Sequence, residues 1–119
     1  MPEHQLAQTQ ESTVERETVL PADVEEVWEA LTDDDRLAEW LGDELDRDVE
    51  EVVEHERLAF TWERPGEGPS RVEFDIEAVP DGTRLVVTET LITGPVALAG
   101  AAWDRRLLAL GRAVLLVAA

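Results

Sequence analysis

The sequence of 119 residues contains no cysteine, no lysine and no tyrosine, and it has only two histidines. The absence of cysteine excludes disulfides, thiol nucleophiles and cysteine-ligated metals. His55 has no second histidine at a metal-binding spacing, and His4 lies in a polar leader, so we expect His55 to be a surface residue. The acidic run 33–35 lacks the glycine and closing glutamate of a calcium loop. We therefore expect no metal and no other cofactor.

Basic residues are scarce as well. All ten are arginines, and they stand against 28 acidic residues, which gives a formal net charge of −18. Such a chain repels nucleic acid and acidic lipid surfaces unless a dense basic patch offsets the charge. The densest basic site is only the pair Arg105-Arg106. We expect no nucleic-acid partner, and we attribute the acidity to solubility.

Long hydrophobic runs are also missing. The apolar stretch 113–119 is far shorter than the roughly 20 residues that cross a bilayer. The first residues lack the basic start and apolar stretch of a secretory signal. The sequence therefore predicts a cytoplasmic location without membrane insertion.

The hydrophobic content is 44% and includes four tryptophans, which is enough for one core and one domain. Residues 1–12 are polar and show no periodicity, so we expect a disordered leader followed by a single domain over 13–119.

Hydrophobic periodicity predicts the elements of this domain in order. An alternating segment, 13–20, is typical of a strand that ends at Pro21. Asp23 and Glu26 have the spacing of a capping box, and they open a helix whose apolar face is Val24, Val27, Trp28 and Leu31. A second short helix begins in the acidic run 33–35, buries Leu37, Trp40 and Leu41, and ends at Gly42.

The middle of the chain is predicted to be antiparallel strands, a weak one at 49–54 and clearer ones at 58–63, 71–78 and 84–92. In the strongest, Val72, Phe74, Ile76 and Ala78 alternate with charged residues, which predicts one buried face and one wet face. Asp81-Gly82 is a hairpin turn signal, and Gly94-Pro95 ends the last strand. The remainder is one long, largely buried helix, with Trp103, Leu107, Leu110, Val114 and Val117 on its apolar face.

Several local segments resemble the START-like (SRPBCC) superfamily, and within it the branch similar to the C-terminal domain of the heat-shock-protein ATPase activator. The segments are 20–22, 24–33, 36–42, 57–62 and 82–85. The resemblance implies an α+β helix-grip fold, in which an antiparallel sheet curves around a long C-terminal helix and two short helices follow the first strand. Members usually carry a further strand hairpin where this chain has only residues 43–48. Two strands are thus expected to be missing.

The resemblance also suggests where a ligand would sit. Arg16 and Glu89 lie on the apolar faces of their strands, and these strands are neighbours in the resembling fold. They form a mutual ion pair, are solvated at the rim of the sheet, or act as polar anchors inside an apolar pocket. Aromatic residues on the inner face form either a packed core or the wall of a cavity. The candidate ligand-binding residues are Arg16, Trp40, Phe60, Trp62, Phe74, Glu89, Trp103 and Leu107.

No catalytic residue is assigned, because no Ser-His-acid arrangement, phosphate-binding glycine loop or paired-carboxylate motif is present. The favoured hypothesis is non-catalytic binding of a hydrophobic or aromatic small molecule, such as a lipid or a polyketide. The alternatives are a chaperone regulator, on resemblance alone, and a small polyketide-cyclase-like enzyme that uses Arg16 and Glu89.

The missing hairpin also predicts an assembly. It makes the strand at 49–54 a sheet edge and leaves the apolar tail of the last helix uncovered. Glutamates along that edge oppose strand pairing, so we expect a homodimer that forms through the C-terminal helix.

Overall fold

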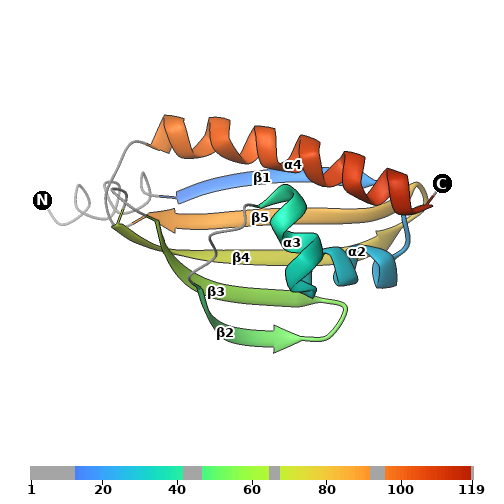
Figure 1. The fold of residues 1–119 in the computed structure, drawn as a ribbon, viewed down its shortest axis with the longest axis horizontal. Helices are drawn as coiled ribbons and strands as arrows, with labels where there is room; N and C mark the ends of the chain where they lie inside the picture. The colour runs from blue at the N-terminus through green and yellow to red at the C-terminus, as the bar shows by residue number, and fades with distance from the viewer. Residues whose placement is uncertain (1–12, 42–46, 65–67, 92–95, 119) are drawn as a thin grey trace, which may run out of the picture.

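The computed structural model describes residues 13–41, 47–64, 68–91 and 96–118. The elements are β1 (Thr13–Leu20), α2 (Val24–Thr32), α3 (Asp34–Trp40), β2 (Arg47–Val53), β3 (Arg57–Arg64), β4 (Gly68–Val79), β5 (Gly82–Leu91) and α4 (Val96–Ala118). The five strands form one antiparallel sheet in the order β1-β5-β4-β3-β2 (Figure 1). This is the predicted α+β helix-grip fold with a shortened sheet.

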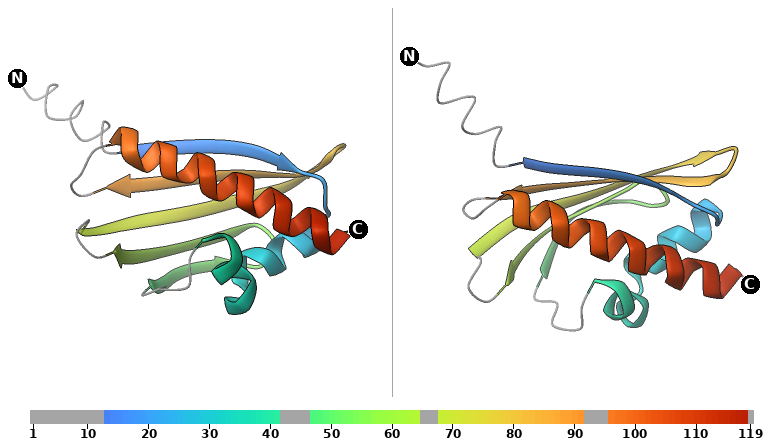
Figure 2. Two further views of the ribbon diagram at one scale, coloured as in Figure 1. Left: turned by 45° about the horizontal axis from the view of Figure 1, so that its top comes forward. Right: turned by 90° about the horizontal axis from the view of Figure 1, so that it is seen from above.

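Within the described part of the chain, helices α2, α3 and α4 lie on one face of the sheet, as the views in Figures 1 and 2 show. Helix α4 contacts β1, α3 and α2, while β2 lies at the opposite edge of the sheet from β1. Trp103, Leu110 and Val114 of α4 are fully buried, and Leu107 is 8% exposed. The predicted apolar face of the long helix is thus confirmed as far as Val114. The apolar tail that begins at Val114 was expected to be uncovered, but Val114 is buried, and the side chains of the rest of the tail lie outside the described residues.

The first helix is capped as its sequence predicts, although only half of the capping box forms. The Asp23 carboxylate accepts a hydrogen bond from the backbone N–H of Glu26 at 2.9 Å. The Glu26 carboxylate instead pairs with Arg36, 2.7 Å away, and Arg36 also reaches Glu29 at 2.8 Å. This pairing joins α2 to α3. Burial lowers the pKa of Arg36, but the hydrogen bonds to both glutamates outweigh it, so that the pKa is raised.

The sheet has the predicted wet and buried faces. Val72, Phe74 and Ile76 are buried on the helix side, while Ala78 is exposed near the hairpin, contrary to prediction. On the outer face Arg71 contacts Glu50 and Glu73, at 3.0 and 3.2 Å. Alternation of this kind fixes the register, because a slip of one residue would turn the buried set outward.

The β4–β5 hairpin requires a glycine at position 82. Gly82 has a φ of +140°, and a Cβ there would lie 2.0 Å from the carbonyl oxygen of Leu20. The turn therefore packs directly on the end of β1, which a side chain would push away.

Edge strand β2 is the predicted weak strand, and its register changes between Val49 and Glu51. Val49 pairs with Phe60 and Val52 pairs with Leu58, so both valines share the inner face with those buried partners. Because the bulge inserts one residue, Glu50 and Glu51 both reach Arg71, at 3.0 and 3.9 Å. The bulge thus turns two carboxylates outward and two valines inward.

Several predictions lie outside the described residues. They are the leader 1–12, the helix end at Gly42, the break at Gly94-Pro95 and the side chain of Val117. Among the described residues, no helix is both long and apolar enough to cross a membrane.

Candidate functional site

Arg16 lies on the inner face of β1, as predicted, but its partner is not Glu89. Its Nε is 2.9 Å from a carboxylate oxygen of Asp104 on α4, and both side chains are partly exposed. Gly100 provides the space for this pair, since a Cβ there would lie 2.4 Å from Nη2 of Arg16. The mutual ion pair considered from the sequence is therefore replaced by one between β1 and α4.

Glu89 is fully buried and accepts hydrogen bonds from three side chains. Oε1 accepts from the indole of Trp103 at 2.7 Å, and Oε2 accepts from the indole of Trp62 at 3.1 Å and from the hydroxyl of Ser70 at 2.5 Å. The Trp62 N–H also donates to the Ser70 oxygen, at 2.7 Å. A buried carboxylate needs such donors because they replace the water it loses.

Arg106 completes this cluster from α4. Its guanidinium carbon lies 5.3 Å from the ring centre of Trp62 and 5.0 Å from that of Trp103, and the two rings are stacked 6.0 Å apart. Sequence reasoning missed both Ser70 and Arg106. The signal for Arg106 was its position three residues after Trp103, which places both on one helical face.

The predicted aromatic residues are brought together as one packed group. Their side chains are at most 4% exposed, and neighbouring ring centres are 5.6–6.0 Å apart, the usual spacing of packed rings. The group comprises Trp40, Phe60, Trp62, Phe74 and Trp103. The Trp40 indole also donates to the carbonyl of Ala30 at 3.0 Å, which ties the group to α2.

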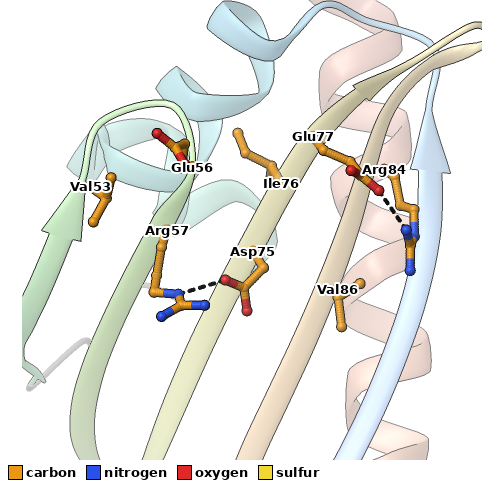
Figure 3. A pocket seen from close by; sticks show the side chains of 8 residues that line it. All are labelled: Val53, Glu56, Arg57, Asp75, Ile76, Glu77, Arg84 and Val86. Atoms are coloured by element: carbon orange, nitrogen blue, oxygen red, sulfur yellow. Dashed lines mark hydrogen bonds and ion pairs between the residues drawn. The ribbon is translucent and has the colours of Figure 1, made fainter.

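A hollow of about 530 Å³ lies on the outer face of the sheet. Figure 3 shows its lining from the end of β2, the turn that follows it, β3, β4 and β5, with α4 behind the strands. Arg57 contacts Asp75 at 2.7 Å and Arg84 contacts Glu77 at 2.5 Å. The hydrogen bond to Asp75 raises the pKa of Arg57, and hydrogen bonds to Glu17 and then Glu77 raise the pKa of Arg84. The outer-face hollow is thus a surface of satisfied ion pairs.

A second hollow, the β1–α4 groove, has a volume of about 420 Å³ and includes Arg16 and Leu107 in its lining. A small hollow of about 220 Å³ lies beside Thr61 and Trp62. Of the predicted site residues, these hollows reach only Arg16, Trp62 and Leu107.

A further hollow, the α2–β2 pocket, lies on the helix side of the sheet and has a volume of about 410 Å³. It is lined by Trp28, Thr32, Arg47, Val49, Val52, Glu54 and Leu58. Val49 and Val52 are 50% and 57% exposed even though they face inward. The two strands that this chain was expected to lack would extend the sheet beyond β2. Without them, this pocket is the open end of the helix-grip fold.

Among the described residues that line this pocket, Arg47 is the only cation. Its side chain is 11% exposed, and its guanidinium carbon lies 5.1 Å from the ring centre of Phe60. Desolvation lowers its pKa, an effect that Asp34 partly opposes from 3.7 Å. Arg47 therefore joins the pocket to the aromatic group behind it.

His55 is exposed, as predicted, in the turn that follows β2. Its φ of +66° is left-handed, and its ring packs edge-on against Trp28 with 6.0 Å between the centres. The described part of the chain contains no group of three potential metal ligands.

Sheet, gripping helix and open-ended interior define a START-like helix-grip domain. The chain belongs to the family described as Activator of Hsp90 ATPase homolog 1-like protein, whose model matches residues 41–104, more than half of the chain. This confirms the family resemblance found in the sequence. No curated protein matches the chain.

Solved structures share the fold. Protein MLL2253 from Mesorhizobium loti is 22% identical with a TM-score of 0.76, over 86% of this chain and 96% of that protein. DynU16, a putative protein in the dynemicin biosynthetic locus, is 28% identical with a TM-score of 0.76, over 85% of this chain but only 46% of its own. The Aha1 dimer from Colwellia psychrerythraea is 16% identical with a TM-score of 0.73, over 86% of this chain and 95% of that protein.

Proposed function

We propose that the chain binds a hydrophobic or aromatic small molecule, without turnover, in the α2–β2 pocket. The observation that carries the proposal is the pair Val49 and Val52, which are half exposed on the inner face of the edge strand. Small-molecule sites combine apolar walls with a few polar groups, in volumes of about 300–1,000 Å³. The pocket volume lies in this range, and its polar groups, Thr32, Arg47 and Glu54, stand among four apolar residues.

The predicted site residues then have different roles. Phe60 connects the pocket to the packed aromatic group, because the guanidinium of the lining residue Arg47 lies over its ring. Trp40, Phe74 and Trp103 are buried members of that group, and we assign them a supporting role. Trp62 and Glu89 belong to the buried polar cluster that supports this wall. Arg16 and Leu107 line the β1–α4 groove, which is the competing site.

Tryptophan fluorescence tests the proposal, because Trp28 lines the pocket. The probe is naphthalene-1-methanol, a neutral aromatic compound that the pocket volume accommodates. We expect saturable quenching in the wild type and its loss in Val52→Asp, since a carboxylate at that wall disfavours an apolar ligand.

Each of the other large hollows contains one valine of similar exposure, which provides matched controls. Val53, 40% exposed, lines the outer-face hollow, and Val19, 47% exposed, lines the β1–α4 groove. Val53→Asp and Val19→Asp should bind the probe as the wild type does. Loss of binding in Val19→Asp alone would move the site to the β1–α4 groove, and no binding by any variant or the wild type would reject the proposal.

A second candidate function is regulation of a chaperone, which the family match favours. An ATPase assay with a chaperone of the Hsp90 class separates it from ligand binding. Stimulation that survives Val52→Asp would establish a protein-interaction role independent of the pocket.

We also propose a homodimer that forms through α4. Leu108 is 59% exposed on this helix, and one solved relative is described as a dimer. Leu108 is the most exposed large apolar residue among the described residues, which makes it the position at which to test a dimer formed through this helix.

A further inference from the structure

We infer that the ligand of the α2–β2 pocket carries a carboxylate, which Arg47 binds while the apolar body rests on the two valines and Trp28. The inference rests on the proposed function and adds the chemical class of the ligand. It follows from how Arg47 is held.

The charge of Arg47 is poorly compensated for its degree of burial. Its nearest carboxylate among the described residues is that of Asp34, 3.7 Å from Nη2, and the side chain of Asp34 is 93% exposed. At that separation the contact is longer than a hydrogen bond, and water screens its exposed partner. In contrast, Arg36 contacts two carboxylates at 2.7 and 2.8 Å.

One nitrogen of the guanidinium also lacks a partner. Nη1 of Arg47 is buried and makes no hydrogen bond within the described part of the chain. Leaving a buried donor unpaired is unfavourable, and more so for a charged group. A guanidinium presents its donors in a fork that matches the two oxygens of a carboxylate. A ligand carboxylate that enters from the pocket would replace the long Asp34 contact at Nη2, and rotation of the guanidinium would bring Nη1 to the second oxygen.

The surroundings of Arg47 select the rest of the ligand. The inward-facing valines, Leu58 and Trp28 offer apolar contact, and Phe60 lies under the guanidinium. The other charged lining residue, Glu54, has a side chain that is 77% exposed, so water screens its repulsion. The geometry therefore fits an aromatic carboxylic acid in preference to a fully neutral compound.

Two probes of the same shape test this inference, 1-naphthoate and the neutral naphthalene-1-methanol. Affinities are measured by tryptophan fluorescence in about 0.15 M salt, where screening limits the effect of the net negative charge to about 8 Å. We expect the wild type to bind the acid at least roughly tenfold more tightly, as a charge-assisted hydrogen-bonded pair in an apolar site would give.

The variant Arg47→Met should lose this preference and keep its affinity for the alcohol, because it retains the apolar stem. Arg47→Lys keeps the charge without the fork, and we expect it to retain only part of the preference. The control is Arg57→Met, which removes an arginine of the outer face and should leave both affinities unchanged. If Arg47→Met does not fold, Arg47→Lys replaces it as the test: a reduced preference for the acid supports the inference, and an unchanged preference overturns it.

The outcomes separate this inference from the proposed function. Equal wild-type affinity for the two probes would overturn the inference and leave the proposed function intact. A preference for the acid that persists in both Arg47 variants would also overturn it. Failure of both probes to bind the wild type would reject the two proposals together.

Discussion

Replacing Glu89 by alanine removes the acceptor of three buried side-chain donors. The Trp62 N–H keeps the Ser70 oxygen as a partner at 2.7 Å, so its loss is partial. The Trp103 N–H and the Ser70 hydroxyl lose the carboxylate entirely. Hydrogen bonds to charged groups contribute about 1.5–3 kcal/mol each, which places the gross loss of two at about 3–6 kcal/mol.

Relief from burying the carboxylate offsets part of this loss. We therefore expect Glu89→Ala to reduce the free energy of unfolding by about 3 kcal/mol, a large share of the 5–15 kcal/mol typical of a domain. Glu89→Gln keeps one acceptor oxygen and should lose about 1–2 kcal/mol, because its amide N–H₂ would face one of the donors.

Urea unfolding followed by far-UV circular dichroism measures these losses without relying on the perturbed tryptophans. The control is Glu63→Ala, the same change at an exposed site on β3, which should alter stability by less than about 0.5 kcal/mol. A Glu89→Ala protein with the wild-type urea midpoint, or a higher one, would refute the view that this carboxylate holds the interior together.

Further changes test the fold. Gly82→Ala should lower the unfolding free energy by about 2 kcal/mol or more, because φ is positive at this position and the new Cβ would lie 2.0 Å from the carbonyl oxygen of Leu20. Gly111→Ala should raise the unfolding free energy by up to about 1 kcal/mol, because its Cβ would lie 3.9 Å from the Leu20 side chain. In thermal melts, Gly100→Ala should raise the melting temperature of an Arg16→Ala protein but change that of the wild type little, because in the wild type the new Cβ displaces the Arg16 guanidinium. An equal rise of the melting temperature in both backgrounds would contradict the packing of Arg16 against Gly100. Sedimentation at micromolar concentration should show a dimer that Leu108→Asp dissociates, and a wild-type monomer would reject the assembly.

The order of elements could be predicted from the sequence because the signals are local and, apart from that of β2, strong. The Asp23 cap, the alternation around Phe74 and the turn at Gly82 all appear in the structure. The inward placement of Glu89 also followed from alternation along β5.

Pairing across the sheet could not be predicted in the same way. Alternation tells which face Arg16 occupies, but its choice of Asp104 over Glu89 depends on the position of α4 and on the space at Gly100. The α2–β2 pocket was missed for a related reason. A regular strand would place Val49 and Val52 on opposite faces, and only the bulge brings them together.

Nuclear magnetic resonance of the tryptophan indole N–H groups tests the central claim most directly, since four tryptophans report on different parts of the molecule. Trp28 lines the pocket, Trp40 donates to a backbone carbonyl, and Trp62 and Trp103 donate to Glu89. On addition of naphthalene-1-methanol, the Trp28 signal should shift with saturation while those of Trp62 and Trp103 stay in place. Shifts confined to Trp62 and Trp103, with Trp28 unchanged, would contradict the account by placing the ligand inside the aromatic group.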